Sequence, residues 1–160
     1  TMTTIFERHA DGACSDAALA RADELALARG LRLTPVRRRV LEILLERHRA
    51  LGAYEVLERL AAEGLGKQPP VAYRALDFLV ENGLAHRIQR LNAFTACQHH
   101  HADDAAPAFL ICRDCQTVAE IDAADLRSAL SDQASAAGFA VERTTIGALG
   151  LCAACARGAA

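Results

Sequence analysis

The sequence predicts an α+β fold made of two small domains, and three observations support this prediction. Between residues 15 and 83, apolar residues recur at helical spacing in four short stretches. Between residues 85 and 97 the apolar period changes to two, which is typical of a β-hairpin. The third observation is a pair of Cys-x-x-Cys motifs near the C-terminus, Cys112–Cys115 and Cys152–Cys155, separated by 36 residues.

Four helices are expected in the N-terminal half, and capping residues delimit them. Thr34 can cap the second helix with Pro35 at its first position, and glycines follow the first, third and fourth helices. The expected helices cover residues 15 to 29, 35 to 49, 52 to 64 and 69 to 83.

Residues 85–90 and 93–97 are expected to form the hairpin, with a turn at Leu91–Asn92. Three helices followed by a two-stranded hairpin is the element order of a winged helix-turn-helix, in which the last of the three helices enters the major groove of DNA. A helical bundle with an appended hairpin has the same pattern, so both interpretations stay open here. The domain bounds follow: 1–96 for a winged-helix DNA-binding domain, 97–107 for a polar hinge loop, and 108–160 for a dimerisation domain.

The C-terminal domain is expected to be a small α/β layer. Strands are expected at 108–112 and 117–121, then a helix from Asp122 to about Gly138, with Leu126, Leu130 and Ala134 facing inward. A third strand is expected over 139–146. A sheet of this size leaves an edge or a face free to pair with a second copy of the chain.

The four paired cysteines predict a structural zinc site. Four thiolates complete a tetrahedral shell around Zn²⁺, which would hold the C-terminal domain together. Two disulfides or redox-active pairs are the alternatives. The N-terminal residues show no basic segment followed by an apolar core, and no apolar run approaches the length of a membrane span. We therefore expect a cytoplasmic protein without a membrane segment, whose thiols bind metal.

Charge is distributed unevenly along the chain. The net charge is −2, but residues 1–96 hold 14 Arg and Lys against 12 Asp and Glu, and residues 97–160 hold 4 against 8. An excess of positive charge in the first half favours contact with an anion there. Arg37, Arg38 and Arg39 on the second helix are expected to contact phosphates, which position a protein on DNA without reading its sequence.

The chain resembles the ferric uptake regulator family of metal-dependent repressors, and its zinc uptake regulator branch in particular. The resemblance rests on Leu33-Thr34-Pro35-Val36-Arg37, on Tyr73-Arg74-Ala75-Leu76-Asp77-Phe78-Leu79 and on the two cysteine pairs. It implies a homodimer that binds an AT-rich pseudo-palindromic operator in double-stranded DNA. It also implies base contacts from Arg74, assisted by Tyr54, and Tyr73 is a further expected DNA-binding residue.

A regulatory zinc site is the second metal prediction. The candidates are scattered: His86, Cys97, the histidine run His99 to His101 and Glu120. A thiolate with imidazoles favours zinc over iron. In the resemblance His86, Cys97 and Glu120 fall on ligand positions, whereas the family histidine of the hinge aligns near Ala105. One residue of the histidine run must then substitute for it, and His99 and His101 are the favoured candidates.

These ligands come from both domains, so a shared zinc ion would fix the domains in one orientation. The expected function is a zinc-responsive repressor of zinc uptake genes, without a small-molecule substrate. The alternatives are a sibling that senses iron, manganese or peroxide, and a thiol-redox switch that uses Cys97, Cys14 or the cysteine pairs. An enzyme with a catalytic zinc is not expected, because no nucleophile elbow, phosphate loop or HExxH motif is present.

Overall fold

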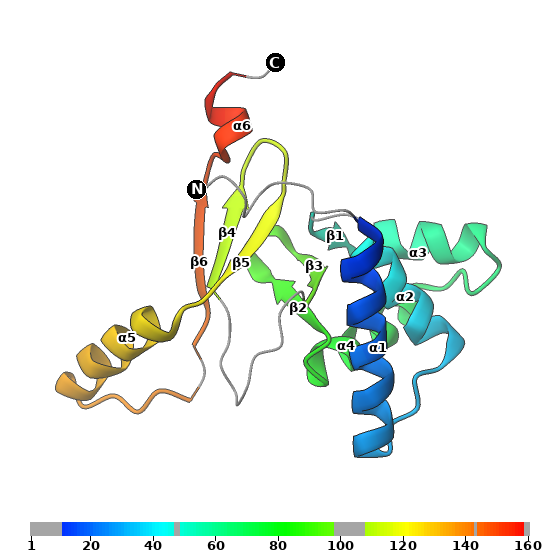
Figure 1. Cartoon of the computed structure of the whole chain (residues 1–160), viewed down its shortest axis with the longest axis horizontal. Helices are drawn as coiled ribbons and strands as arrows, with labels where there is room; N and C mark the ends of the chain where they lie inside the picture. Colours follow the sequence, from blue (N-terminus) through cyan, green and yellow to red (C-terminus); the bar gives the residue numbers. More distant parts are fainter. Residues whose placement is uncertain (1–10, 47–48, 98–107, 143, 159–160) are drawn as a thin grey trace. The chain divides into compact units, whose positions relative to one another are not determined.

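A computed structural model of the 160-residue chain describes residues 11–46, 49–97, 108–142 and 144–158. These residues form two compact units, divided between residues 97 and 108. The N-terminal unit holds helices α1 to α4 and strands β1 to β3, and the C-terminal unit holds β4 to β6 with α5 and α6 (Figure 1). The predicted α+β class is confirmed. No helix in the described ranges is long and apolar enough to cross a membrane.

The four predicted helices of the N-terminal unit are present. They are α1 (Asp11–Arg29), α2 (Pro35–Leu45), α3 (Ala53–Ala62) and α4 (Pro69–Glu81). The Thr34 hydroxyl accepts a hydrogen bond from the Arg37 backbone N–H at 3.3 Å and so caps α2. The expected extension of α2 to Arg49 is wrong, because the chain becomes extended there and enters strand β1 (Leu51–Gly52).

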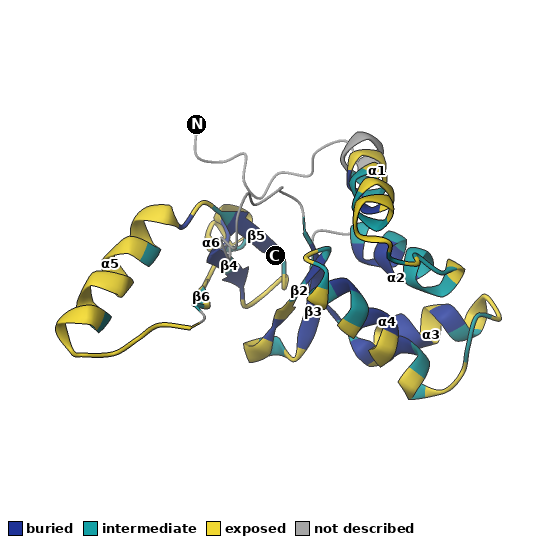
Figure 2. Ribbon diagram, turned by 90° about the horizontal axis from the view of Figure 1, so that it is seen from below, coloured by how far each residue is buried: buried dark blue, intermediate teal, exposed yellow. Residues whose placement is uncertain are grey.

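A single apolar core holds α2, α3 and α4 together. Each helix turns one face inward, and the buried faces alternate with exposed ones along the ribbon (Figure 2). The largest fully buried side chains of this core are Leu41, Ile43, Leu44, Leu60, Leu76 and Leu79. Such a core gives α4 a fixed position within its unit, because close-packed interiors resist rearrangement.

A three-stranded antiparallel sheet completes the N-terminal unit. Its order is β1-β3-β2, with β2 at Ala85–Ile88 and β3 at Ala93–Ala96. Strand β2 ends two residues earlier than predicted, because residues 89–91 form a 3₁₀ turn that leads to Asn92 at φ 47°. Three helices followed by this hairpin confirm the element order of a winged helix-turn-helix.

The C-terminal unit is built on a mixed sheet of order β5-β4-β6. Strand β4 (Ala108–Cys112) pairs antiparallel with β5 (Val118–Ile121) and parallel with β6 (Ile146–Gly150). The predicted strand over 139–146 is wrong: Ile146 already pairs with Ala108, the first residue of β4. Residues 139–142 therefore precede the part of the chain that pairs with β4, and no described strand pairs with them.

Helix α5 (Ala124–Ala136) does not bury an apolar face within this unit. Leu126 and Leu130 are 50% and 46% exposed, and no residue of α5 is buried (Figure 2). The inward orientation predicted for Leu126, Leu130 and Ala134 is therefore wrong. Their periodicity is that of an amphipathic helix, but the described part of the chain offers no surface that covers them.

We predict that Gly66→Ala destabilises the protein by about 2–3 kcal/mol, because two costs combine. Gly66 has φ +154°, and a Cβ there would lie 2.8 Å from Cγ1 of Val71. Gly64→Ala is the matched control, since Gly64 has φ +74° but nothing within 4 Å of its Cβ position. The control should cost only the backbone strain, about 1 kcal/mol. Urea unfolding followed by helical circular dichroism measures both, and equal losses would contradict the steric part.

Candidate metal centres and nucleic-acid interface

The parallel pairing of β4 with β6 brings the two cysteine pairs together. Cys112, the last residue of β4, lies opposite Gly150, the last residue of β6. Cys115 lies in the turn between β4 and β5, and Cys152 follows β6 directly as the N-cap of the short helix α6 (Ala153–Ala156). Parallel strands end at the same edge of the sheet, so the two cysteine pairs meet there although 36 residues separate them in the sequence.

The four sulfurs fit a tetrahedral zinc site. All four Sγ atoms lie within 4.8 Å of one another. The Sγ atoms of Cys115 and Cys152 are 3.8 Å apart. Zn–S bonds of about 2.3 Å in a regular tetrahedron give an S–S edge of about 3.8 Å, whereas a disulfide is about 2.05 Å long. The donor set and its spacing are therefore those of a structural Zn²⁺ site.

The surroundings of Cys112 and Cys155 shift the pKa values of their thiols in opposite directions. Burial raises the pKa of the Cys112 thiol, but backbone N–H groups of Cys115, Cys152 and Asp114 outweigh burial and bring the pKa to about 6. Hydrogen bonds with Cys152 and Cys112 raise the pKa of Cys155 to about 12. The surroundings thus favour the thiolate form at Cys112 and disfavour it at Cys155, where a bound cation would favour ionisation.

The hairpin of the N-terminal unit brings two further ligands together. His86 lies on β2, and Cys97 follows β3, where its backbone N–H donates to the Leu84 carbonyl at 2.9 Å. A ring nitrogen of His86 and the Cys97 sulfur lie within 4.8 Å of each other, and both residues are partly exposed. This pair can supply two soft ligands, and a zinc site needs at least one more.

Glu120 belongs to the C-terminal unit. It lies on β5 opposite Phe109 and is only 7% exposed. A carboxylate at such a position is costly unless it is paired, hydrogen-bonded or coordinated to a metal. His99 and His101 lie outside the described residues, and so does the side chain of Cys14.

The predicted base-reading residues lie on exposed helix surfaces of the N-terminal unit. Tyr54 in the first turn of α3 is 66% exposed, and Tyr73 on α4 is 38% exposed. Arg74 is also exposed, one residue further along α4. The neighbouring Ala72 and Ala75 point into the core, so the backbone of this turn is held while Tyr73 and Arg74 face outward.

The three arginines of α2 differ in their contacts. Arg37 places its guanidinium 3.8 Å from the centroid of the Phe78 ring on α4 and donates to the Arg32 carbonyl at 2.7 Å. Arg38 pairs with Asp23 at 2.6 Å. Among the described residues, Arg37 forms no ion pair with a carboxylate, so its charge is the least compensated of the three.

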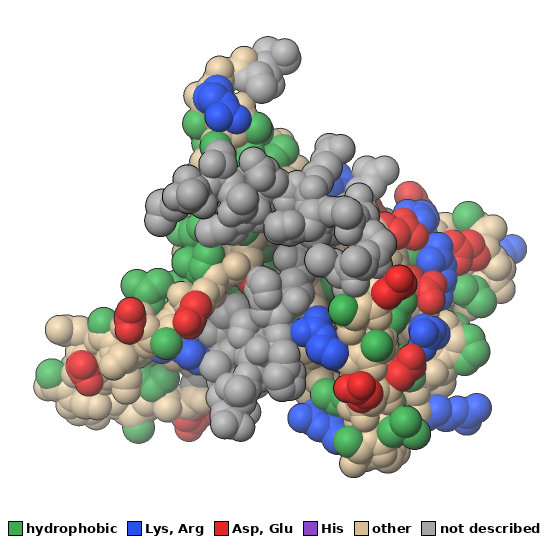
Figure 3. Space-filling model, in the orientation of Figure 1, with side chains coloured by type: hydrophobic (Ala, Val, Ile, Leu, Met, Phe, Trp, Pro, Cys, Tyr) green, Lys and Arg blue, Asp and Glu red, His purple; other side chains and the backbone are tan. Residues whose placement is uncertain are grey.

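Arg39 lies in an ion-pair network that joins α2 to the end of α3. Its guanidinium contacts both carboxylate oxygens of Glu63 at 2.7 Å and also reaches Glu42 and Glu46. The bond to Arg39 holds the pKa of the Glu63 carboxyl below its ordinary value. Positive and negative side chains accordingly alternate on this side of the unit (Figure 3). The network ties the helices together and competes with any contact of Arg39 to phosphate.

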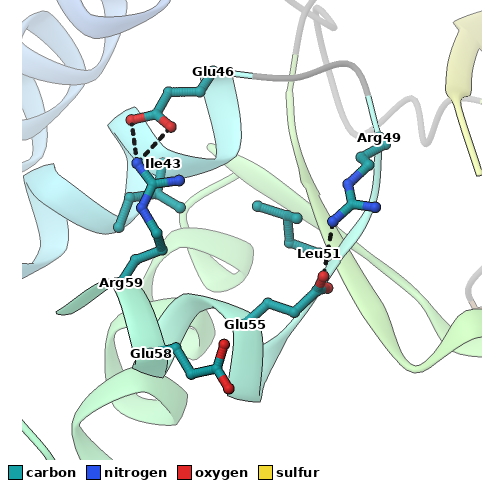
Figure 4. A pocket seen from close by; sticks show the side chains of 7 residues that line it. All are labelled: Ile43, Glu46, Arg49, Leu51, Glu55, Glu58 and Arg59. Carbon is teal, nitrogen blue, oxygen red and sulfur yellow. Dashed lines mark hydrogen bonds and ion pairs between the residues drawn. The ribbon is translucent and has the colours of Figure 1, made fainter. Parts of the chain in front are cut away.

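A shallow pocket of about 220 Å³ lies beside this network, at α2, β1 and α3. Two ion pairs cross it, Arg59 to Glu46 at 2.7 Å and Arg49 to Glu55 at 2.8 Å (Figure 4). Most of its charges neutralise one another, which gives little basis for selective binding of a charged substrate.

Comparison with known proteins places the chain in a family. The model of the ferric uptake regulator family matches residues 28–148, more than half of the chain. The zinc uptake regulation protein of Escherichia coli (strain K12) is 36% identical over 137 residues, covering 86% of this chain and 80% of the relative. The chain belongs to the ferric uptake regulator family. This confirms the resemblance, and because the family consists of regulators, the protein is not an enzyme.

Other proteins similar to this chain are also named zinc uptake regulators. The zinc uptake regulation protein of Shigella flexneri shows the same identity and coverage as the relative from Escherichia coli. A zinc uptake regulator complexed with zinc and DNA is 34% identical with a TM-score of 0.85, covering 91% of this chain and 97% of that chain. Holo XcZur is 37% identical with a TM-score of 0.79, covering 89% and 99%.

Several contacts of these sites are not visible as sequence patterns. Asp23 and Glu63, the partners of Arg38 and Arg39, lie on other helices than α2. Within the basic stretch itself only Glu42 and Glu46 carry negative charge. Phe78 lies one helical turn after Arg74, and its spacing indicates only a partly buried helix face.

We predict that Cys152→Ser removes the zinc of the four-cysteine site and unfolds the C-terminal unit. The residue is 7% exposed, and structural zinc contributes about 10–16 kcal/mol of binding free energy in zinc-finger peptides, more than a small domain can lose. Metal content by atomic emission and ellipticity by circular dichroism check this. Cys97→Ser is the control and should keep this zinc. A Cys152→Ser protein with full zinc content would contradict the assignment.

Proposed function

We propose that the protein is a zinc-responsive transcriptional repressor that binds operator DNA as a homodimer and represses zinc uptake genes. The observation that carries the proposal is that a ring nitrogen of His86 and the Cys97 sulfur lie within 4.8 Å of each other on the hairpin of a winged helix-turn-helix. It places soft metal ligands on the same rigid unit as the exposed helix α4. The names of the relatives support the metal and the nucleic acid: zinc uptake regulation, and a regulator complexed with zinc and DNA.

The regulatory site is proposed to take ligands from both units. His86 and Cys97 come from the hairpin, Glu120 from β5, and His99 or His101 from the segment between them. Imidazole, thiolate and carboxylate groups can all coordinate one Zn²⁺ ion. By holding the same ion, these residues restrict the two units to one relative orientation. The thiolate favours zinc over iron or manganese, which distinguishes this proposal from the metal-sensing siblings.

The coupling between zinc and operator follows from linkage. Zinc can shift the equilibrium between orientations of the two units only by as much as it binds one orientation more tightly than the others. Coupling free energies between two ligands, here zinc and operator DNA, are typically about 1–3 kcal/mol. Operator DNA should therefore tighten zinc binding by the same factor by which zinc tightens operator binding. The four-cysteine site has no such role, because a closed shell of four thiolates has no open position.

Dimerisation is proposed to use the exposed apolar residues of the C-terminal unit. They lie on α5, on the segment after it, on β6 and immediately beyond β6: Leu126, Leu130, Phe139, Val141, Leu149 and Leu151. A second copy would cover these side chains, which are too many to expose in a stable monomer of this size. A dimer also matches the two-fold symmetry of a pseudo-palindromic, AT-rich operator. Such a repressor acts in the cytoplasm.

We predict that Cys97→Ser abolishes zinc-dependent operator binding and leaves a folded dimer. The substitution removes the softest ligand of the proposed regulatory site while the four-cysteine site stays intact. Fluorescence anisotropy with labelled operator, titrated with zinc, iron or manganese, measures the response. Size-exclusion chromatography with light scattering verifies the dimer. Full zinc activation in this variant would eliminate Cys97 as a regulatory ligand.

We predict opposite signatures for Arg74→Ala and Arg37→Gln in DNA binding. Arg74→Ala should cost about 1–3 kcal/mol on the operator and little on random DNA, because a bidentate contact to guanine discriminates by that amount. Arg37→Gln should weaken both DNAs alike and lower the slope of log K against log salt by about 0.9, as expected for one lost phosphate contact. Arg157→Ala, an exposed charge in the other unit, is the control. Equal losses on both DNAs for Arg74→Ala would reassign it to the backbone.

A further inference from the structure

Cys115 is the most exposed residue of the four-cysteine site. Cys112 and Cys152 are 1% and 7% exposed, Cys155 is partly buried, and Cys115 is exposed. A reagent or chelator arriving from solvent therefore meets Cys115 first. Thiolate reactivity depends on such exposure as well as on ionisation.

A side-chain hydroxyl contacts this accessible sulfur. Thr117 Oγ1 lies 3.2 Å from the Sγ atom of Cys115. The Thr117 backbone is fixed to the same turn, because its carbonyl accepts from the Cys112 N–H at 3.0 Å. A free thiol can donate to the hydroxyl, but a zinc-bound thiolate carries no proton. The hydroxyl must then be the donor, and a hydrogen bond to an ionised acceptor is stronger than a neutral one.

Cys115 and Cys112 depend on different kinds of donor. The Cys112 sulfur receives the Cys152 backbone N–H at 3.4 Å, a bond that no side-chain substitution removes. The hydrogen bond at Cys115 involves the Thr117 side chain, so a substitution that removes the hydroxyl removes the bond. Hydrogen bonding to a metal ligand fixes its orientation, and it withdraws electron density from a thiolate that would otherwise attack an electrophile.

We propose that Cys115 is the thiolate at which soft electrophiles open the four-cysteine site, and that Thr117 is the positioning residue that restrains it. With iodoacetamide, the Cys115 sulfur forms a bond to the methylene carbon as the carbon–iodine bond breaks and iodide leaves. The resulting thioether would be a poorer zinc ligand than the thiolate. The remaining thiolates then hold the metal less tightly. The inference rests on zinc in this site and does not depend on DNA binding.

The test compares Thr117→Val with Thr117→Ser in the full-length, zinc-loaded protein. Valine keeps the shape of threonine without the hydroxyl, and serine keeps the hydroxyl. Each protein is treated with iodoacetamide, the modified cysteines are identified by mass spectrometry, and zinc release is followed with a chromogenic chelator. In the unsubstituted protein Cys115 should be the first of the four cysteines to react. Thr117→Val should accelerate this reaction and zinc release about 10-fold, within the range of outer-shell effects, and Thr117→Ser should not.

Several outcomes would overturn the proposal. If Cys112, Cys152 or Cys155 reacts first, Cys115 is not the residue at which electrophiles open the site. If the valine and unsubstituted proteins react at equal rates, Thr117 does not restrain Cys115. Cys97, in the other unit, is the internal reference, and an equal acceleration there would reveal general loosening of the fold. If Thr117→Val fails to load zinc, Thr117→Ser decides: normal loading supports the hydroxyl, and equal failure overturns its role. Absence of zinc from the unsubstituted protein would instead contradict the metal site itself.

Discussion

The parallel register of β4 and β6 is the constraint on which the C-terminal unit depends. It brings four thiol groups to one edge of the sheet, where Cys112 lies opposite Gly150 and the sulfurs fall within 4.8 Å. Four thiolates this close would repel one another, and a bound cation offsets that repulsion. Among the described residues of this unit, α5 buries no side chain and every residue of β6 after Ile146 is exposed, so its buried apolar side chains lie mainly on β4 and β5. The metal therefore stabilises this unit in the way that an apolar core stabilises a larger one.

The N-terminal unit solves the same problem without metal. Its core draws on all four helices and on all three strands. Ion pairs between Arg39, Glu63 and Glu46 lie at the periphery and link the helices that the core already holds. Arg37 adds a contact of another kind, because its guanidinium covers the Phe78 ring on α4. Helix α4, the proposed recognition helix, is held on one side by leucines and at its edge by this stacking. It would therefore present Tyr73 and Arg74 from a rigid support, as the reading of a DNA sequence requires.

Local features of this fold were predictable from the sequence and long-range ones were not. Thr34 and Pro35 act through near neighbours, so their spacing was enough to predict the α2 cap. The four-cysteine cluster joins distant parts of the chain, and it was predictable only because four thiolates in two Cys-x-x-Cys pairs are a known zinc ligand set. The position of β6 depends on which residues face β4, and the alternation of Phe139 and Val141 resembles a strand without having a partner. The exposure of α5 could not be predicted for the same reason. Periodicity shows that a helix has an apolar face, but it does not show whether another part of the same chain covers that face.

The four-cysteine site and the proposed regulatory site differ in how many of their ligands one unit already brings together, and this difference would suit them to different tasks. Four thiols of one unit converge on the structural site, so zinc binding there is part of folding and is not readily reversed. At the hairpin, the pairing of β2 with β3 fixes His86 and Cys97 side by side, and the proposed remaining ligands belong to other parts of the chain. Two ordered ligands lower the entropic cost of binding, but the incomplete shell leaves affinity dependent on recruiting the others. As proposed, such a site would respond to zinc supply, because completing its ligand shell would also fix the orientation of the units.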